Sequence, residues 1–520
     1  MKRIAFFAVL AALLVALVIF RNNNAEDAVV EKEAPEGRNM FGNGLERGLV
    51  KNTDEATPGY VMLTVQKSAS TYLMDRDGNI VHEWKSNYGI HGGYLMNDGT
   101  LYVDANDVDF PVFAGGGECG RLQKLSWDSK ILWDFEYANE EHHHHHDFAV
   151  MPNGNVLAIA WESISPEECL ALGRKPELIP EAGLWPDKIV EIKPQGKHGG
   201  EVVWEWHAWD HVVQNYDKSL PNYGDPSEYP GRIDINLCSN PLPEPITQDS
   251  MDRLHAMGRE WRNRTVENRG SDLYHFNAVN YNAKLDQIAI SSPKLNEIFI
   301  IDHSTTTDQA AGSTGGRWGR GGDLLYRWGN PENYGRGDTT DRVLGGQHDV
   351  RWIEEGKPGA GNLTIFNNNQ NLDPDTLNYS SVLEIKPPTD SVGNYILSEN
   401  GVFGPEEPEW KYIADDTLSF WSSFVSGAHR LSNGHTFVNQ GAMGRLFEIT
   451  ADGEIVWDYL NQHEGNIRKP NGDPFPPSPF AMLQFRATLI PTSHPALAGK
   501  ELEPIDPQPE PYKPQPRPEE

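Results

Sequence analysis

The chain has little of what marks several common classes of protein. It contains 3 cysteines in 520 residues, which is too few for a disulfide framework. Two of Cys119, Cys169 and Cys238 could pair and leave one thiol over, but three unpaired cysteines are the simpler interpretation. Long helical patterns are scarce, whereas 15 tryptophans, 49 glycines and 37 prolines are present. This composition indicates many short strands joined by turns.

Positive charge is also in short supply. The chain has 44 Lys and Arg against 75 Asp and Glu, a formal net charge of -31 at pH 7. Because affinity for nucleic acid comes from clustered Lys and Arg, the composition argues against a nucleic-acid partner. An acidic shell mainly keeps the protein soluble. If the substrate is an anion, the binding site must therefore supply positive charge of its own.

One long apolar run is present, at residues 4–20, and it follows Lys2 and Arg3. A basic start before an apolar run is typical of a signal peptide or a short signal anchor. No small-x-small cleavage site follows the run cleanly, which slightly favours an uncleaved anchor. We therefore expect segment 1–24 to export the protein, as a periplasmic or membrane-anchored protein that faces the periplasm or the exterior.

Between two low-complexity ends, the chain contains a repeat. Six copies of a strand end in paired aromatic or aromatic-like residues: IVHEW, ILWDF, VVWEW, LLYRW, PEWKY and EIVWDY. Five are followed by a hairpin that opens with histidine. Two hairpins per unit predict four strands, so residues 59–490 are predicted to form an all-β, six-bladed β-propeller. Residues 25–58 are expected to be an acidic linker, and 491–520 an extended, unpacked Pro-rich tail.

The ends of the repeat region suggest how the ring closes. Residues 59–66, GYVMLTVQ, form a strand without a hairpin of its own, and LQFRATLIP near residue 489 has no following partner. We expect these two strands, from opposite ends of the chain, to pair and close the propeller. The non-repeat segments 163–187 and 208–272 are expected to be loop insertions on one face, where specificity often lies.

The histidines that open the hairpins are His91, His146, His275, His348 and His429. If they begin the innermost strands, they converge at one mouth of the central channel, although the sixth strand has no histidine. The run of five histidines ends at His146, and we expect its first four residues, 142–145, to form mostly a solvated loop. Only His145 or His146 is then expected to reach the channel.

A ring of imidazoles could bind a metal, act as acid, base or nucleophile, or hold an anion. Asp147 and Asp349 directly follow His146 and His348, and neighbours on a strand point to opposite faces. This weakens a metal site in the channel, and we expect no metal and no cofactor. Metal binding at the surface by residues 142–145 stays open.

Four motifs resemble the exported bacterial arylsulfate sulfotransferases, which use no nucleotide sulfate donor. They are HHD…PNGN at 145–155, the His-x-Asn of YHFNAVNY at 275–277, QHD at 347–349, and AHRLSNGHT at 428–436. The resemblance covers roughly residues 60–490. It implies a six-bladed propeller and a ping-pong reaction, in which a channel histidine takes the sulfuryl group from an aryl sulfate and passes it to a phenol.

The resemblance also implies roles for individual residues. It makes His348 the nucleophile, with His275 and His146 as further catalytic residues and His145 as the alternative to His146. Asn277 follows His275 by two residues, so both side chains face the same side of a strand and Asn277 is expected to bind substrate.

The cationic contacts depart from the family pattern. Where the family has an arginine, this chain has Pro293 followed by Lys294, which supplies charge without the bidentate fork of arginine. His429 and Arg430 are the candidates for a further contact, and His91 completes the binding set. Two alternatives remain: a propeller that only binds a partner, and a metal-dependent lyase or hydrolase that uses the channel histidines.

Overall fold

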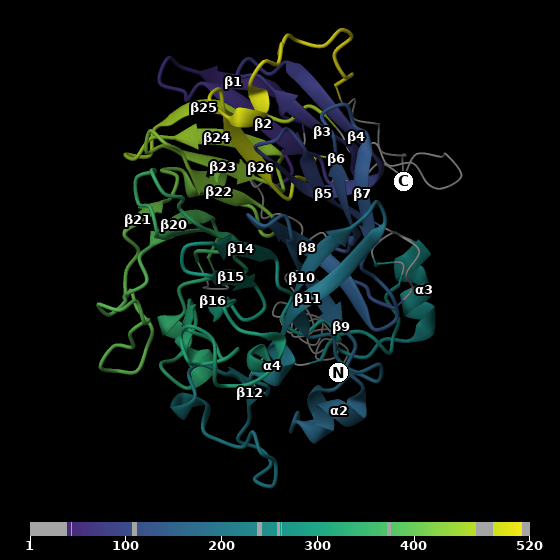
Figure 1. The fold of residues 1–520 in the computed structure, drawn as a ribbon, viewed down its shortest axis with the longest axis vertical. Helices are drawn as coiled ribbons and strands as arrows, with labels where there is room; N and C mark the ends of the chain where they lie inside the picture. Colours follow the sequence, from purple (N-terminus) through teal and green to yellow (C-terminus); the bar gives the residue numbers. More distant parts are fainter. Residues whose placement is uncertain are drawn as a thin grey trace, which may run out of the picture.

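The computed structural model describes residues 39–42, 44–106, 112–236, 242–256, 260–261, 263–371, 376–463 and 482–511. The expected export segment 1–24 and Cys238 lie outside these ranges. The described chain is nearly all β, with antiparallel sheets and short helices in the connections (Figure 1). Those α-helices are α2 (Pro166–Ala171), α3 (Gln248–Ala256) and α4 (Thr307–Ala310). None of the described helices is long and apolar enough to span a membrane.

Three sheets have four strands each, in chain order from one edge to the other. The first contains β8 (His142–Val150), β9 (Val156–Glu162), β10 (Asp187–Gln195) and β11 (Gly199–His207). The second contains β14 (Ala278–Asn282), β15 (Gln287–Ser292), β16 (Glu297–Asp302) and β17 (Tyr326–Trp328). The third contains β18 (His348–Trp352), β19 (Leu363–Asn367), β20 (Ser381–Ile385) and β21 (Trp410–Tyr412). Within the 208–272 insertion, β12 (Val212–Val213) and β13 (Ile233–Asp234) form a short parallel pair.

The largest sheet has seven strands, in the order β26-β2-β3-β4-β5-β6-β7. Its members are β2 (Gly59–Thr64), β3 (Ser68–Met74), β4 (Ile80–Leu95), β5 (Leu101–Asn106), β6 (Gly120–Leu125), β7 (Ile131–Glu136) and β26 (Ala487–Pro491). The first half of β4 pairs with β3, and its second half pairs with β5. The long strand β4 therefore joins two groups of strands into one sheet.

Strands from opposite ends of the chain pair with each other, as the sequence predicted. β2 and β26 are antiparallel, with Val61 opposite Leu489. A second such pairing was not predicted: β1 (Gly48–Asn52) pairs with β25 (Ile455–Leu460). The sheet that results has the order β1-β25-β24-β23-β22 and includes β22 (Gly427–Arg430), β23 (Thr436–Gln440) and β24 (Arg445–Ile449). β1 lies inside the range expected to be a linker, where its mostly exposed residues give no apolar alternation.

The tail after residue 491 was expected to be unpacked, and this was wrong for its first half. Ala496 and Leu497 are buried, and the backbone N–H of Ile505 donates to the carbonyl of Ile80 at 2.9 Å. The side-chain amide of Gln508 donates to the same carbonyl at 2.9 Å. Although the tail is rich in proline, its few apolar side chains cover the outside of the sheet that contains β4.

The repeated aromatic residues connect neighbouring sheets. The indole N–H of Trp133 in β7 donates to Gly199 at the start of β11, at 2.8 Å. Equivalent bonds of 2.7 to 2.8 Å run from Trp206 to Gly322, from Trp328 to Pro405, from Trp410 to Ala451 and from Trp457 to Arg76. The last of these returns from β25 to the β3–β4 turn. A buried indole needs a partner for its N–H, and here the next sheet provides it.

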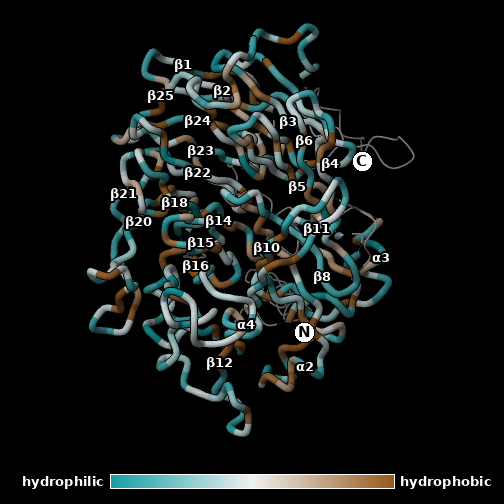
Figure 2. Tube along the Cα trace, viewed as in Figure 1, coloured by the Kyte–Doolittle hydropathy of each residue, from teal (hydrophilic) through white to brown (hydrophobic). Residues whose placement is uncertain are grey.

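The strands are arranged with one edge of each sheet toward the middle of the molecule. In Figure 1, β8, β14 and β22 lie near the centre, and β21 and β25 lie at the periphery. Hydrophobic residues follow the strands and hydrophilic residues mark many of the connections (Figure 2). The apolar cores lie between consecutive sheets, as in the cluster that joins Ile159 of β9 to Ile290 of β15.

Candidate active site

Four of the five repeated histidines come together in the structure. His91 lies in the second half of β4, His146 in β8 and His348 at the start of β18, while His275 precedes β14. None of the four is more than 5% exposed. The rings of His146 and His275 meet edge to face with centroids 4.4 Å apart, and the His91 ring lies 6.0 Å from that of His146.

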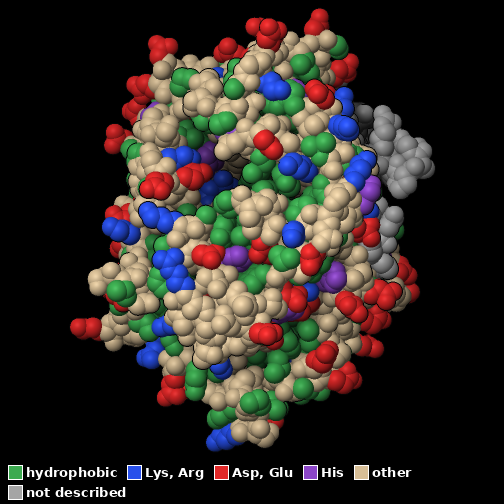
Figure 3. Space-filling view, viewed as in Figure 1, with side chains coloured by type: hydrophobic (Ala, Val, Ile, Leu, Met, Phe, Trp, Pro, Cys, Tyr) green, Lys and Arg blue, Asp and Glu red, His purple; other side chains and the backbone are tan. Residues whose placement is uncertain are grey.

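Phe485 lies among these histidine rings. Its ring centroid is 4.1 Å from that of His91 and 5.9 Å from that of His146. The centroid of the His348 ring lies 6.4 Å from that of Phe485. Phe485 immediately precedes Arg486 and β26, in the repeat that carries no histidine. Figure 3 shows a hollow near β22 and β26, with His and Lys or Arg side chains visible inside it.

The backbone at the inner ends of the strands is strained. His146 and His275 have φ values of 59° and 56°, and Asp349, next to His348, has 57°. Residues other than glycine rarely adopt this region, and such strain often collects at functional sites. Strands β8 and β18 also shift register at these positions, so bulges redirect their side chains. A Cβ atom on Gly117 would lie 2.3 Å from the His146 ring, so that ring needs a glycine beside it.

The run of histidines before Asp147 is buried, and the predicted solvated loop was wrong. His143, His144 and His145 are fully buried in β8, and only His142 is partly exposed. The His145 ring stacks on Trp161 at 3.9 Å, and the His142 ring stacks on Tyr137 at 4.1 Å. Alternate side chains of the strand therefore pack against different aromatic surfaces. Burial lowers the pKa of His143 to about 3, so its ring is neutral.

His275 is held by a buried carboxylate. Its Nδ1 lies 2.5 Å from Asp272 Oδ2, and Asp272 Oδ1 accepts from the Trp161 indole at 3.0 Å. The Lys294 ammonium donates to Asp272 Oδ2 at 3.0 Å. Burial alone would raise the pKa of Asp272, but His275 and Lys294 outweigh it and hold the pKa below its usual value. Lys294 and His275 thus share the Asp272 carboxylate.

His146 and its predecessor share a hydrogen bond. The Nδ1 atoms of His145 and His146 are 2.7 Å apart, so one ring donates and the other accepts. Burial, followed by the neighbouring His275, lowers the pKa of each well below its usual value. Both rings are therefore neutral near pH 7. Asp187 lies 3.0 Å from His145 Nε2.

His348 is fixed in one tautomer. Its Nδ1 lies 2.9 Å from Asn368 Oδ1 and 3.0 Å from the carbonyl of Gly346. The Asn368 amide nitrogen donates to the carbonyls of Ser422 and Val425, which orients its oxygen toward His348. Since both partners of Nδ1 are acceptors, Nδ1 carries the proton. Nε2 then carries the lone pair, and it accepts from the Val425 N–H at 3.1 Å.

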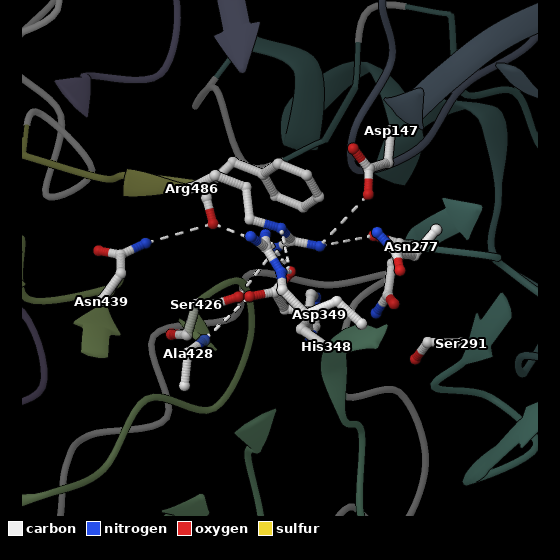
Figure 4. A network of polar contacts seen from close by, with 12 residues as sticks. Asp147, Asn277, Ser291, His348, Asp349, Ser426, Ala428, Asn439 and Arg486 are labelled. Carbon is white, nitrogen blue, oxygen red and sulfur yellow. Dashed lines mark hydrogen bonds and ion pairs between the residues drawn. The ribbon is translucent and has the colours of Figure 1, made fainter. Parts of the chain in front are cut away.

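The sequence analysis missed Arg486, which lies at the centre of this polar network (Figure 4). Its guanidinium is 3.0 Å from Asp349 and 3.7 Å from Asp147, and it donates to the carbonyl of Asn277 at 3.1 Å. Arg486 also donates to the carbonyl of Ser426 at 2.8 Å. These contacts come from β8 and β18 and from the residues just before β14 and β22. The missing histidine in the sixth repeat was the available signal for this position.

Asp147 and Asp349 play matching roles around Arg486. Asp147 Oδ2 accepts from the backbone N–H of Val279 at 3.2 Å, and Asp349 Oδ2 accepts from that of Ala428 at 2.9 Å. Each carboxylate thus joins its own inner strand to the next one. Burial raises the pKa of Asp147 to about 6, although Arg486 opposes the shift. The two aspartates therefore point inward to a cation, and not away from the channel.

Three other predicted site residues have structural partners. Asn277 Nδ2 donates to the carbonyl of Gln347 at 2.8 Å, which connects β14 to the residue before His348. His429 Nε2 accepts from the backbone N–H of Leu489 at 3.3 Å. Arg430 forms an ion pair with Glu384 and donates to the carbonyl of Gly434 at 2.8 Å.

The structure therefore does not bring His429 and Arg430 into the histidine cluster. Both lie on β22, where the ring of His429 also faces Phe437 and the guanidinium of Arg430 lies over the Trp410 ring. Their side chains are used to join neighbouring strands and sheets. The positive charge beside the histidines comes from Arg486 and Lys294 instead.

The sheets and the buried histidine cluster define a protein built almost entirely of β-sheets, with several buried imidazoles gathered at the inner ends of its strands. The model of the Arylsulfotransferase (ASST) family matches residues 46–466. The chain belongs to this family and is an arylsulfotransferase, with aryl sulfates and phenols as its substrate class.

Other comparisons add little. No curated protein sequence matches the chain. A Bacteroides caccae protein of unknown function is 11% identical with a TM-score of 0.40, over 78% of this chain and 95% of its own. The Pseudomonas aeruginosa periplasmic gluconolactonase PpgL is 8% identical with a TM-score of 0.38, over 83% and 99%. A streptogramin B lyase is 10% identical with a TM-score of 0.35, over 80% and 88%. These scores are too low to support an argument about this chain.

Proposed function

We propose that this arylsulfotransferase works by a ping-pong mechanism with a sulfohistidine on His348. The observation that carries the proposal is the fixed tautomer of His348. Asn368 and Gly346 accept from Nδ1, so the lone pair is on Nε2 without any further proton transfer. An imidazole nitrogen in this state is a nucleophile at neutral pH.

In the first step, Nε2 of His348 attacks the sulfur of the aryl sulfate, and the bond from sulfur to the aryl oxygen breaks. The leaving oxygen takes a proton from Nε2 of His275, whose imidazolium form is stabilised by Asp272 at 2.5 Å. In the second step, a phenol gives its proton to His275 and attacks the same sulfur. The bond from sulfur to His348 breaks, and His348 returns to its neutral form.

Charge on the sulfuryl oxygens needs donors that are already in position. His146 is neutral, and if it accepts at Nδ1 from His145, its Nε2 carries a proton that it can donate. Arg486 supplies a fixed positive charge in the same network, 5% exposed and held between Asp147 and Asp349. This provides the local cation that an acidic protein needs for an anionic substrate.

The bond from Val425 to His348 Nε2 must break before attack, because it occupies the lone pair. Val425 and Ser426 have φ values of 51° and 90°, which is unusual for a β-branched residue and for serine. We infer that substrate displaces the Val425 amide and that relief of this backbone strain lowers the cost of doing so.

The same proposal includes the architecture and the location. We propose six blades, in which β4 serves two blades at once and β26 completes the first. The five tryptophan bonds between consecutive sheets, including the return from Trp457 to Arg76, support a closed ring. We further propose that segment 1–24 exports the protein to the periplasm or anchors it there, and that the insertions at 163–187 and 208–272 select the acceptor.

The test is release of phenol from a fluorogenic aryl sulfate by the purified protein, with and without a second phenol as acceptor. We expect turnover that depends on the acceptor and falls by at least about a thousandfold in His348→Ala. His198→Ala is the matched control, because His198 is exposed on a turn remote from the cluster, and it should keep full activity. Wild-type protein exposed to donor alone should gain the mass of one SO₃ group.

Other outcomes separate the alternatives. Binding of the aryl sulfate without turnover in any donor would favour a propeller that only binds. Cleavage whose rate does not depend on the acceptor and that yields an unsaturated or hydrolysed product would favour a lyase or hydrolase. A covalent SO₃ group that still forms in His348→Ala would show that another histidine is the nucleophile.

A further inference from the structure

A second cluster of buried side chains lies beside the histidine site. His91 of β4, Asp104 of β5 and Cys119, just before β6, place one possible ligand atom each within 4.8 Å of one another. His91 Nδ1 is 3.4 Å from Asp104 Oδ2, and Cys119 Sγ is 3.5 Å from the same oxygen. The three residues are 5%, 1% and 0% exposed. They combine the nitrogen, oxygen and sulfur donors that zinc prefers.

The spacing of these atoms fits a tetrahedral zinc ion. Ligands at zinc distances of roughly 2.0 Å for nitrogen and oxygen and roughly 2.3 Å for sulfur lie about 3.3 to 3.7 Å apart in a tetrahedron. The two distances to Asp104 Oδ2 fall in that interval. His91 and Asp104 come from the paired strands β4 and β5, where a register shift at His91 turns its side chain toward Asp104.

The hydrogen bonding of the cluster is incomplete without a cation. Both ring nitrogens of His91 are buried and make no hydrogen bond with any described residue. Asp104 Oδ1 accepts from the Gly92 N–H at 2.6 Å, which orients Oδ2 toward His91 and Cys119. Within the described ranges, no Lys or Arg forms an ion pair with Asp104. A buried carboxylate whose nearest partners are an imidazole and a thiol lacks strong compensation.

A candidate for the fourth donor lies on β8, outside the group of three whose donor atoms are all within 4.8 Å of one another. His144 is fully buried, and its Nδ1 is bonded to the carbonyl of Ile159 at 2.8 Å. Its Nε2 has no hydrogen-bond partner in the described part of the chain. The Cys119 N–H donates to the His144 carbonyl at 3.3 Å, so these two residues are neighbours. A histidine whose other nitrogen bonds a backbone carbonyl is the common arrangement in zinc sites.

We propose that His91, Asp104 and Cys119 bind one Zn²⁺ ion, and that the His144 side chain moves toward them to supply the fourth ligand. Four protein ligands leave no open position, so the site is structural and takes no part in sulfuryl transfer. It joins β4, β5, the segment before β6, and β8. Its effect on the active site is indirect: it fixes His91, whose ring lies 6.0 Å from that of His146. His91 is thereby reassigned from substrate binding to metal binding.

The experiment measures metal in the full-length purified protein. After dialysis, elemental analysis should find about one equivalent of zinc per chain in the wild type. Zinc affinity should fall at least about tenfold in Cys119→Ser and in Asp104→Asn. Cys169→Ser is the matched control, because Cys169 is also a buried free cysteine but lies in α2. It should keep the wild-type zinc content.

A second measurement does not depend on the folding of any variant. Wild-type protein stripped of zinc and loaded with Co²⁺ should show a thiolate-to-cobalt charge-transfer band and the intense visible bands of four-coordinate cobalt. Wild-type protein that binds neither zinc nor Co²⁺, or Co²⁺ spectra without a thiolate band, would overturn the proposal. Equal zinc content in wild type and Cys119→Ser would overturn it as well. None of these results depends on whether aryl sulfate is turned over, so the site can be judged apart from the proposed mechanism.

Discussion

The backbone N–H of Val425 donates to Nε2 of His348 at 3.1 Å, while Asn368 accepts from Nδ1 of the same ring at 2.9 Å. One partner thus sets where the proton is, and the other covers the lone pair that this leaves. In the resting site the lone pair of His348 is therefore occupied by the backbone amide of Val425, which lies in a strained segment of backbone.

The role of Asn368 can be tested by removing its side chain. In Asn368→Ala, only the Gly346 carbonyl still accepts from Nδ1, so the preference of His348 for this tautomer is weakened. We expect kcat to fall on the order of a hundredfold while KM for the aryl sulfate changes little. Steady-state kinetics with saturating acceptor would measure both. An equal rise in KM with no loss of kcat would contradict a positioning role, and thermal unfolding would show whether the lost bonds to Ser422 and Val425 also matter.

Arg486 should be essential to the fold as well as to the site. Arg486→Met leaves Asp147 and Asp349 buried without this cation, which should cost roughly 3–5 kcal/mol of unfolding free energy. Arg486→Lys keeps the positive charge but not the bidentate geometry of the guanidinium, so the loss of unfolding free energy should be smaller. Chemical denaturation of the two variants would compare them, and equal stability of Arg486→Met and wild type would refute the prediction.

Asp147 predicts a pH dependence of stability. Its pKa is raised from the model-compound value of 3.8 to about 6, so the folded state binds this proton more tightly than the unfolded state. This contribution is present below about pH 4 and is lost as the pH rises through 6, with a size of about 3 kcal/mol. Asp147→Asn does not titrate. Its stability relative to wild type should therefore improve between pH 4 and pH 7 by up to that amount.

The measurement is denaturant unfolding of both proteins at a series of pH values. The bonds that asparagine loses to Tyr94 and to the backbone shift the whole curve and do not change its slope. A constant difference between the two proteins across this range would show that the carboxyl is not the titrating group.

Removing the indole N–H at two of the junctions between sheets should lower the unfolding free energy by different amounts. Trp457→Phe removes a buried indole that donates to Arg76 at 2.8 Å and lies under its guanidinium at 4.1 Å. We expect a loss of about 1–3 kcal/mol. Trp410→Phe removes the same kind of bond, to Ala451, at a more exposed position and should cost less. Denaturant midpoints with unchanged m-values would establish the order, and the reverse order would count against a special role for the Trp457 junction.

The sequence predicted those features that repeat. His91, His146, His275 and His348 were found because equivalent positions in successive units converge, and the pairing of β2 with β26 followed from two strands without partners. Periodicity carries this information because each unit must present the same strand edge to the centre.

Features that occur once were missed or misread. Arg486 belongs to a segment that was considered only for closure, and the bond of Lys294 to Asp272 was not foreseen. The burial of His143 and His144 could not be read from a polar run, because it depends on Trp161 and other aromatic groups from other strands. Asp104 directly follows the hairpin that His91 opens and Cys119 lies in the next connection, but neither repeats in other units. The left-handed backbone at His146 leaves no mark in residue type.

The pairing of Val61 with Leu489 has a consequence for how the protein matures. The seven-stranded sheet receives its edge strand β26 only after all its other strands have been made, so synthesis must pass residue 491 before that sheet can be completed. Until then β2 has an open edge at the place where β26 later pairs. Assembly of the active centre is delayed in the same way, because Phe485 and Arg486 arrive with that final strand.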